Sequence, residues 1–264
     1  MSATTGFRRL VLELGHGAAD PAMLRQAAAF ALLVDAELHA LFVEDEILLN
    51  VSALPFAREI SPLSFEWRPL KPDRLEAELK AAAEQARRHL EEAARETGVR
   101  QKFEVRRGDL ALQVTEACVA TDILVVASPR REASHGSRRW RETAHRSAAS
   151  VLFLPPVAGR RHGPVVAVVT LARDHSLAVA RLLAAQSRES LMVLAAAGSE
   201  LDGDPMIRPL RGTGAQDINS ALGDARERLI VMTRGGDATL ADVGAVLAIS
   251  RGVPVLLVEP IAGG

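Results

Sequence analysis

Arginine side chains crowd one short segment of the sequence. Residues 130–146 hold six arginines, with His135 and His145 among them. A guanidinium fork binds two phosphate oxygens at once, so this segment could bind a nucleotide or another small anion through its side chains. The alternative is a solvated loop whose arginines pair with nearby glutamates. The candidate anion-binding residues here are Ser128, Arg130, Arg131, Ser137 and Arg138.

A second candidate site follows the first apolar run of the chain, at Gly15-His16-Gly17. Two glycines would let a ligand approach the backbone N–H groups, and His16 would offer a polar contact. A tight turn that merely needs glycine torsions explains the same residues equally well. Both readings are kept as hypotheses.

Signals for catalysis or metal binding are missing from the sequence. No His or Cys spacing indicates a metal site, and no nucleophile has a base nearby with local support. The single cysteine, Cys118, lies in an apolar helical pattern, which predicts a small core residue rather than a reactive thiol. We therefore expect a protein that is not an enzyme.

The elements that must position these candidates occur twice along the chain. Residues 121–128 and 227–233 are similar apolar runs, and each is followed by a polar loop, a helical segment and a second apolar run. A repeat of this length indicates tandem α/β units. We expect domains at 1–156 and 157–264, joined by the Pro- and Gly-containing linker Pro155 to Pro164.

Alternating strands and helices predict a parallel sheet with right-handed crossovers in each unit. The expected strands are 10–14, 37–43, 102–106, 123–127 and 151–154, then 165–169, 191–194, 229–232 and 255–258. The expected helices are 21–34, 73–97, one after Asp109, and 140–149, then one after Asp174, 215–225 and 239–249. Asp73 and Glu76 suggest a capping box, and 44–72 is expected to be irregular. The second unit lacks a match for the helix 73–97, so it is a trimmed copy.

Ligands of such sheets bind at the carboxyl ends of the strands, where the strand order reverses. For five strands in the order 3-2-1-4-5, this switch point lies between strands one and four. In the first copy it brings together Gly15 to Gly17 and residues 128–131. In the second copy it brings together Thr170, Leu171 and residues 233–237.

Composition limits the classes of partner. The chain has 264 residues, is 48% hydrophobic and 3% aromatic, and carries a formal net charge of −1. This balance gives no field that favours nucleic acid or an anionic membrane, and no apolar run is long enough to span a bilayer. The sequence predicts a cytoplasmic protein that binds neither nucleic acid nor membranes.

Several short sequence motifs, in their order along the chain, resemble those of a known protein family. They are 35–43 (Asp-Ala-Glu-Leu-His-Ala-Leu-Phe-Val), 107–109 (Arg-Gly-Asp), 120–126 (Ala-Thr-Asp-Ile-Leu-Val-Val) and 253–258 (Val-Pro-Val-Leu-Leu-Val). Together they resemble the universal stress protein family in its tandem form, over nearly the whole chain. The resemblance implies an adenine nucleotide alpha hydrolase-like α/β fold: two tandem open parallel five-strand sheets, order 3-2-1-4-5, flanked by helices.

The resemblance also shows what this chain lacks. Members of the family that bind ATP carry an Asp after strand one, a glycine pair after strand four, and then a Gly followed by Ser or Thr, which lets phosphates approach the backbone. The matching positions here are Gly15, Ser128, Arg131 and Arg141-Glu142, then Thr170, Thr233, Gly236 and Val246-Leu247. We therefore expect no cofactor and a non-enzymatic stress-response protein that acts by binding or assembly. The alternative is a molecular switch that binds ATP or another adenine nucleotide at a modified site in the first copy.

Two surfaces are expected to make contacts. Strand five of each copy is short, apolar and at a sheet edge, and an exposed apolar edge favours strand pairing. Since similar proteins pair this edge between subunits, we expect the two copies to pair within one chain as a pseudo-dimer. The apolar, Pro-broken segment Leu48 to Trp67 has no counterpart in the second copy. It is expected either to mediate a homodimer or protein contact, or to fold back as a lid on its own domain.

Overall fold

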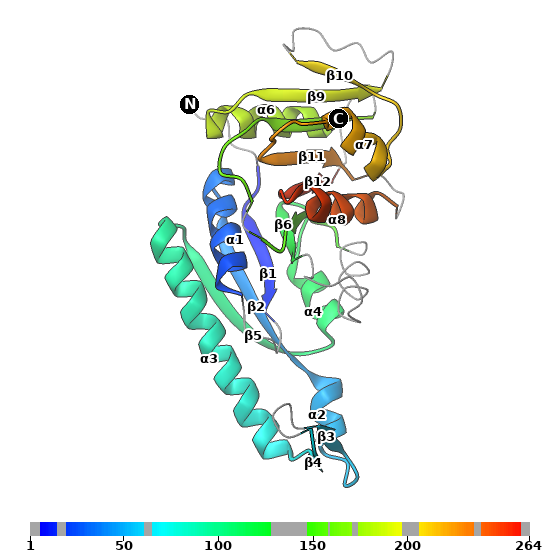
Figure 1. Ribbon diagram of the computed structural model, residues 1–264. Coiled ribbons are helices and arrows are strands. Elements are labelled where there is room, and N and C mark those ends of the chain that lie inside the picture. The colour runs from blue at the N-terminus through cyan, green and yellow to red at the C-terminus, as the bar shows by residue number, and fades with distance from the viewer. Residues whose placement is uncertain are drawn as a thin grey trace.

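The computed structural model describes residues 6–14, 20–60, 65–127, 147–157, 159–170, 174–196, 206–234 and 239–259. Within these residues, one continuous sheet runs through the molecule in the order β10-β9-β8-β11-β12-β7-β6-β1-β2-β5 (Figure 1). The strands are β1 (Arg9–Leu14), β2 (Glu37–Asp45), β5 (Gln101–Gly108), β6 (Asp122–Ala127), β7 (Ser150–Leu154), β8 (Val165–Val169), β9 (Leu191–Ala196), β10 (Ile207–Leu210), β11 (Leu229–Thr233) and β12 (Val255–Val258). The helices are α1 (Pro21–Val34), α2 (Glu46–Ser52), α3 (Pro72–Thr97), α4 (Leu110–Ala117), α6 (His175–Ser187), α7 (Ala215–Leu222) and α8 (Thr239–Arg251).

Each half of the sheet has the strand order expected from the sequence. Counted within its own half, the order is 3-2-1-4-5 in both copies. The registers also correspond, because strand one pairs with strand four at Leu10 and Ile123 in the first copy and at Val165 and Leu229 in the second. The α/β fold and the tandem repeat are therefore confirmed.

The junction between the halves is the strand pairing that the sequence predicted. β7 and β12 pair antiparallel, with Leu152 opposite Leu256, whereas the neighbours of each strand on its other side are parallel. Pairing the two apolar edges removes them from solvent and gives the two halves one uninterrupted sheet. The pseudo-dimer within one chain is thus confirmed.

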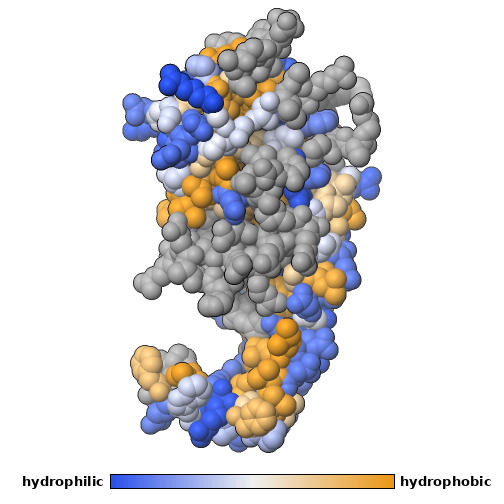
Figure 2. All heavy atoms as spheres, turned by 90° about the vertical axis from the view of Figure 1, so that its right-hand side faces the viewer, coloured by the Kyte–Doolittle hydropathy of each residue, from blue (hydrophilic) through white to orange (hydrophobic). Residues whose placement is uncertain are grey.

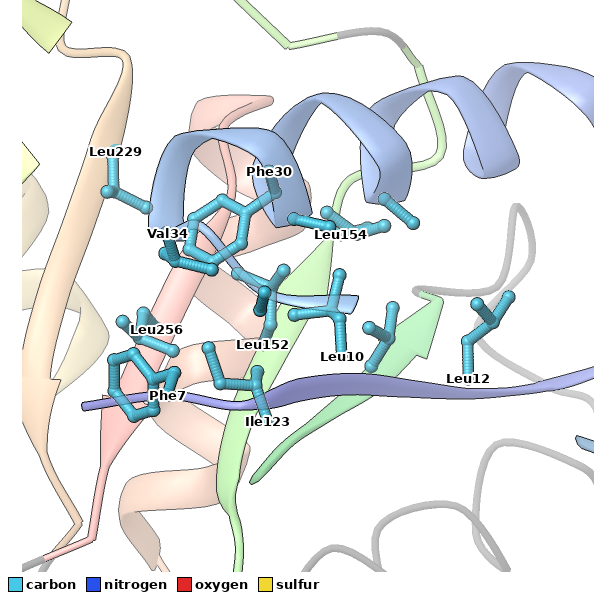
Figure 3. Packing of buried hydrophobic residues seen from close by; sticks show 14 of the residues in the cluster. Phe7, Leu10, Leu12, Phe30, Val34, Ile123, Leu152, Leu154, Leu229 and Leu256 are labelled. Carbon is cyan, nitrogen blue, oxygen red and sulfur yellow. The ribbon is translucent and has the colours of Figure 1, made fainter. Parts of the chain in front are cut away.

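The core lies on both faces of this sheet. One cluster packs between the sheet and α1, α3 and α6, and the other lies on the opposite face with α4, α7 and α8. Figure 3 shows the first cluster at the junction, where Leu10 and Leu152 from the first copy lie with Leu256 from the second. Both clusters contain residues from the two halves, so they join the halves as well as stabilising each one. Each fully buried aliphatic side chain contributes about 1.5–3 kcal/mol.

Aspartates begin three of the helices, as their position before an apolar pattern predicts. Asp20, Asp109 and Asp174 accept hydrogen bonds from backbone N–H groups in the first turn of α1, α4 and α6. The capping box expected at Asp73 was wrong. α3 begins at Pro72 after Lys71, with no side-chain cap. Proline fits the first helical position because its torsion is already fixed, and this places Asp73 inside the first turn.

The segment 44–72 is more ordered than expected. Asp45 caps α2, and β3 (Arg58–Ile60) pairs antiparallel with β4 (Trp67–Pro69). We call residues 46–60 and 65–69, which contain α2, β3 and β4, the arm; it lies with the N-terminal end of α3 at the far end of the molecule (Figure 1). These elements are too short for a periodic pattern to reveal them in the sequence.

Two other expectations need correction. β10 was not identified as a strand, because it is short, contains Pro209 and lies at the sheet edge, where proline is tolerated. Residues 147–149 are not helical, contrary to the expected helix 140–149, whose remaining residues lie outside the described ranges. Only residues 197–206 separate β9 from β10, too few for a helix like α3, so the second copy is trimmed as predicted. Of the helices described, none is both long and apolar enough to cross a membrane.

Candidate functional site

The switch point of the first copy lies at the carboxyl ends of β1 and β6. These strands pair side by side, and β1 ends at Leu14 and β6 at Ala127. The candidate binding residues predicted for the first copy follow these two strand ends and all lie outside the described residues. They are Gly15, His16, Gly17, Ser128, Arg130, Arg131, Ser137 and Arg138. The hypotheses of an anion-binding loop and of a backbone approach at the glycines thus stay predictions.

Directly below this switch point, Glu13 lines a small cavity of about 60 Å³ with Leu12, Met23, Val125 and Ala127. The Glu13 carboxyl is half-buried among these apolar side chains, and its reduced contact with water raises its pKa to about 8. At neutral pH this carboxyl is therefore mostly protonated, so it can donate a hydrogen bond and places little negative charge at the site.

Glu13 was not among the residues selected from the sequence. In the sequence, Glu13 is simply a charged residue within the apolar run 10–14. The feature that could have identified it is its position, because it is a lone acidic residue next to the end of a buried strand, beside the switch point. Such a group is costly to bury unless it becomes neutral, which is why its pKa carries information about the site.

At the switch point of the second copy, the described side chains form a hydrogen-bond network with one another. The Asp174 carboxylate accepts hydrogen bonds from the Thr170 N–H at 2.8 Å and the Ser176 N–H at 3.0 Å. It also accepts one from the hydroxyl of Thr233, at the end of β11. Thr170 and Thr233 were both placed at this switch point from the sequence, and the structure brings them together through Asp174.

This network includes Thr233, which stands at the position of the first glycine of the family's phosphate loop. The N–H of Ser176, in the first turn of α6, points at the Asp174 and Thr233 oxygens, and the Ser176 hydroxyl donates to the carbonyl of Val168 at 3.1 Å. A helix N-terminus attracts anions because its N–H groups are unpaired, but here a carboxylate already accepts from them. An anionic ligand at this point would have to displace Asp174.

Cys118 and His39 are both buried and belong to the structural core rather than to a site. Cys118 is buried, and burial raises the pKa of its thiol to about 12, so it is unreactive at neutral pH. His39 is buried in β2, where a ring nitrogen lies 3.1 Å from a Glu104 carboxylate oxygen. Within the ranges that the structure describes, no three His, Cys, Asp or Glu side chains converge as a metal site.

The arm presents its apolar side chains to solvent. Phe56, Phe65 and Trp67 are 76%, 81% and 61% exposed, and Figure 2 shows apolar residues on the end of the molecule that carries the arm. These three side chains belong to neither core cluster, so the described residues of the segment 48–67 favour a contact with another chain over a lid. The contact with another chain stays a prediction.

Comparison with known proteins rests on structure alone. No protein-family model matches the chain, and neither does any curated protein sequence. A universal stress protein from Archaeoglobus fulgidus DSM 4304 is 15% identical with a TM-score of 0.63, over 94% of this chain and 96% of that one. A functionally unknown protein from Pseudomonas aeruginosa PAO1 is 13% identical with a TM-score of 0.61, over 97% and 94%.

These likenesses extend over both halves of the sheet and not over one copy alone. At this level of identity they report on the fold and not on what the chain binds. The chain therefore has the fold of a tandem universal stress protein.

Proposed function

We propose that this chain is a non-enzymatic, cytoplasmic protein of the universal stress type, which acts by binding or assembly and has lost ATP binding in the usual manner. The observation that carries the proposal is the hydrogen-bond network at the switch point of the second copy. There the Asp174 carboxylate accepts hydrogen bonds from Thr170, Ser176 and Thr233, so negative charge stands beside Thr233, at the position of the first glycine of the phosphate loop.

In the first copy the support comes from residue types. Arg131 stands where a phosphate loop needs a residue without a side chain, and Gly15 stands where an acidic contact to the nucleotide is expected. Glu13, mostly neutral at pH 7, does not replace that charge. The loss of these residues removes the backbone approach on which tight phosphate binding depends.

A second candidate function is a nucleotide-binding switch in the first copy. The six arginines of residues 130–146 follow β6 directly and favour it. Guanidinium groups could hold phosphates through side chains where backbone N–H groups cannot. The two functions make opposite predictions for adenine nucleotides.

The deciding experiment is thermal unfolding with and without ATP and Mg²⁺, combined with mass spectrometry of small molecules released from the purified protein. ATP at about a hundredfold above its Kd would stabilise the fold by about 2.7 kcal/mol, which a melting curve detects readily. We expect little shift at millimolar ATP and no released nucleotide. A clear shift that disappears in Gly15→Val and Ser128→Glu variants would establish the switch instead.

Assembly is proposed to use the arm. Burying one large apolar side chain contributes about 1.5–3 kcal/mol, and Phe56, Phe65 and Trp67 are all mostly exposed. The second copy has no equivalent segment, so the pseudo-symmetry within the chain leaves this surface uncovered. Another molecule of the same protein, binding through its own arm, would cover this surface in a homodimer.

A further inference from the structure

A pocket of about 250 Å³ lies between the two halves, away from both switch points. One wall is α1 of the first copy, with Arg25 and Phe30. The other wall comes from the linker and from the start of strands in the second copy, with Arg161, Arg228 and Pro254. Its position at the amino ends of β11 and β12 separates it from the strand ends at which ligands of this fold are expected.

Positive charge dominates this pocket. Four arginines line it: Arg25, Arg160, Arg161 and Arg228. Nearby acidic groups are largely engaged elsewhere. Glu227 is fully buried and accepts two hydrogen bonds from Arg251, at 2.7 and 2.9 Å, while Arg160 lies 3.9 Å away.

Glu189, the other nearby acid, lies 3.0 Å from a His162 ring nitrogen and 3.9 Å from Arg228. Among the described residues, no carboxylate lies within ion-pair distance of Arg25 or Arg161. These two guanidinium groups therefore bring positive charge to the pocket that no carboxylate of the described residues neutralises.

The rest of the lining is apolar. Phe30, Leu33, Leu229 and Pro254 contribute carbon surface, and Phe30 and Leu229 are themselves almost completely buried. Pockets for small molecules combine such a surface with a few charged groups that orient the ligand. The volume of about 250 Å³ lies just below the usual range of about 300–1,000 Å³, which fits a small ligand.

The pseudo-symmetry of the chain gives an internal comparison. Because Leu10 and Val165 occupy the same register, Gly6 and Phe7 in the first copy correspond to Arg161 and His162 in the second. Phe7 is buried in the core cluster at the junction (Figure 3). His162 is instead 90% exposed. The two copies thus differ next to Arg161: an aromatic ring is buried at this position in the first copy, and an imidazole is exposed in the second.

We propose that this pocket binds a small phosphate monoester that carries an apolar group. Arg25 and Arg161 bind the phosphate oxygens, and the apolar group lies against Phe30, Leu33 and Pro254. Since the ligand contacts α1 from one half and the linker from the other, its binding stabilises the arrangement of the two halves. This proposal does not depend on whether ATP binds at a switch point.

The test uses phenyl phosphate as the probe, with isothermal titration calorimetry for affinity and thermal unfolding for stability. Inorganic phosphate, benzyl alcohol and NaCl at equal ionic strength are the comparison solutes. We expect phenyl phosphate to bind more tightly than inorganic phosphate and to raise the Tm, and benzyl alcohol and NaCl to leave the Tm unchanged. No binding heat and no shift beyond that of NaCl would overturn the proposal.

Three variants locate the site. Arg25→Gln and Arg161→Gln should each weaken phenyl phosphate binding roughly tenfold or more, because each removes a charge-assisted contact. Without ligand each should match or slightly exceed the wild-type Tm, since like charges no longer repel. Ala29→Phe, which fills the pocket without changing its charge, should also abolish binding.

Arg95→Gln is the matched control, because it removes an exposed arginine on α3 that does not line the pocket. Its affinity should equal that of the wild type. If Arg95→Gln weakens binding as much as Arg25→Gln, the effect is one of overall charge and the proposal fails. It also fails if Ser128→Glu abolishes binding while Arg25→Gln and Arg161→Gln do not, which would assign the ligand to the switch point.

Discussion

The guanidinium group of Arg9 donates two hydrogen bonds to the carboxylate of Asp122, at 3.0 and 2.5 Å, and the Asp122 side chain has no exposed surface. This pair joins the first residue of β1 to the first residue of β6. Asp122 also accepts from the N–H of Val119 at 2.9 Å, so the carboxylate is held from two sides. The pair fixes the amino ends of the two strands whose carboxyl ends form the switch point.

Replacing Arg9 by Met should destabilise the protein by about 3–5 kcal/mol, because it leaves the buried Asp122 carboxylate without its counter-charge. The measurement is the free energy of unfolding from urea denaturation. Arg8→Met is the control, since Arg8 is its exposed neighbour in the sequence, and it should change stability by less than about 0.5 kcal/mol. Equal effects of the two variants would mean that the pair contributes nothing specific.

Stability should depend on pH through Glu13. Its pKa is raised from 4.5 to about 8 in the folded protein, so the folded state binds the extra proton between these values. The stabilisation is present at low pH and is lost as the pH rises through about 8. Glu13→Gln keeps a neutral side chain of the same shape, so it should gain stability over the wild type as the pH rises from about 5 to about 9.

Comparing variant with wild type isolates this effect. Burial lowers the pKa of His39, and its contribution has the opposite sign, since stability then rises with pH; both proteins contain it, so it cancels. Glu116→Gln, at an exposed position on α4, should follow the wild-type profile. A stability difference between Glu13→Gln and wild type that does not change with pH would contradict a raised pKa for Glu13.

The strand junction predicts energetic coupling between the halves. Leu152 and Leu256 are opposite each other in β7 and β12 and are fully buried. Each Leu→Ala substitution should cost about 2–5 kcal/mol. In a double-mutant cycle the two should be non-additive by about 0.5–3 kcal/mol, because they share one packing environment. Strict additivity would show that the halves do not pack here in solution.

Assembly through the arm predicts a change in sedimentation. Wild type should sediment as a homodimer in analytical ultracentrifugation, and a Phe56→Ser/Trp67→Ser variant should sediment as a monomer with nearly the wild-type free energy of unfolding, because both rings are exposed within one chain. Val105→Ser, which changes an exposed apolar residue of β5 outside the arm, should leave the dimer intact. Two monomers with equal stability would exclude the arm as an interface.

Much of the architecture follows from local sequence. Continuous apolar runs such as Val165–Val169 predict strands buried on both faces, and an aspartate before an apolar pattern predicts a helix start at Asp20, Asp109 and Asp174. The order and repetition of these elements predicted the strand order, and the apolar edges predicted that β7 pairs with β12. The sequence did not predict the short elements of mixed polarity, which are β10, α2 and the β3–β4 hairpin.

The chemistry of the sites was decided by tertiary structure. Asp174 and Thr233 are distant in the sequence, yet they hydrogen bond across the second switch point. Glu13 has a raised pKa only because side chains from other elements surround it. The basic pocket combines Arg25 with Arg161 and Arg228, which come together only when the two halves pack. Composition and spacing determine which elements form, because those preferences are local, but burial and electrostatic neighbours depend on contacts between distant residues.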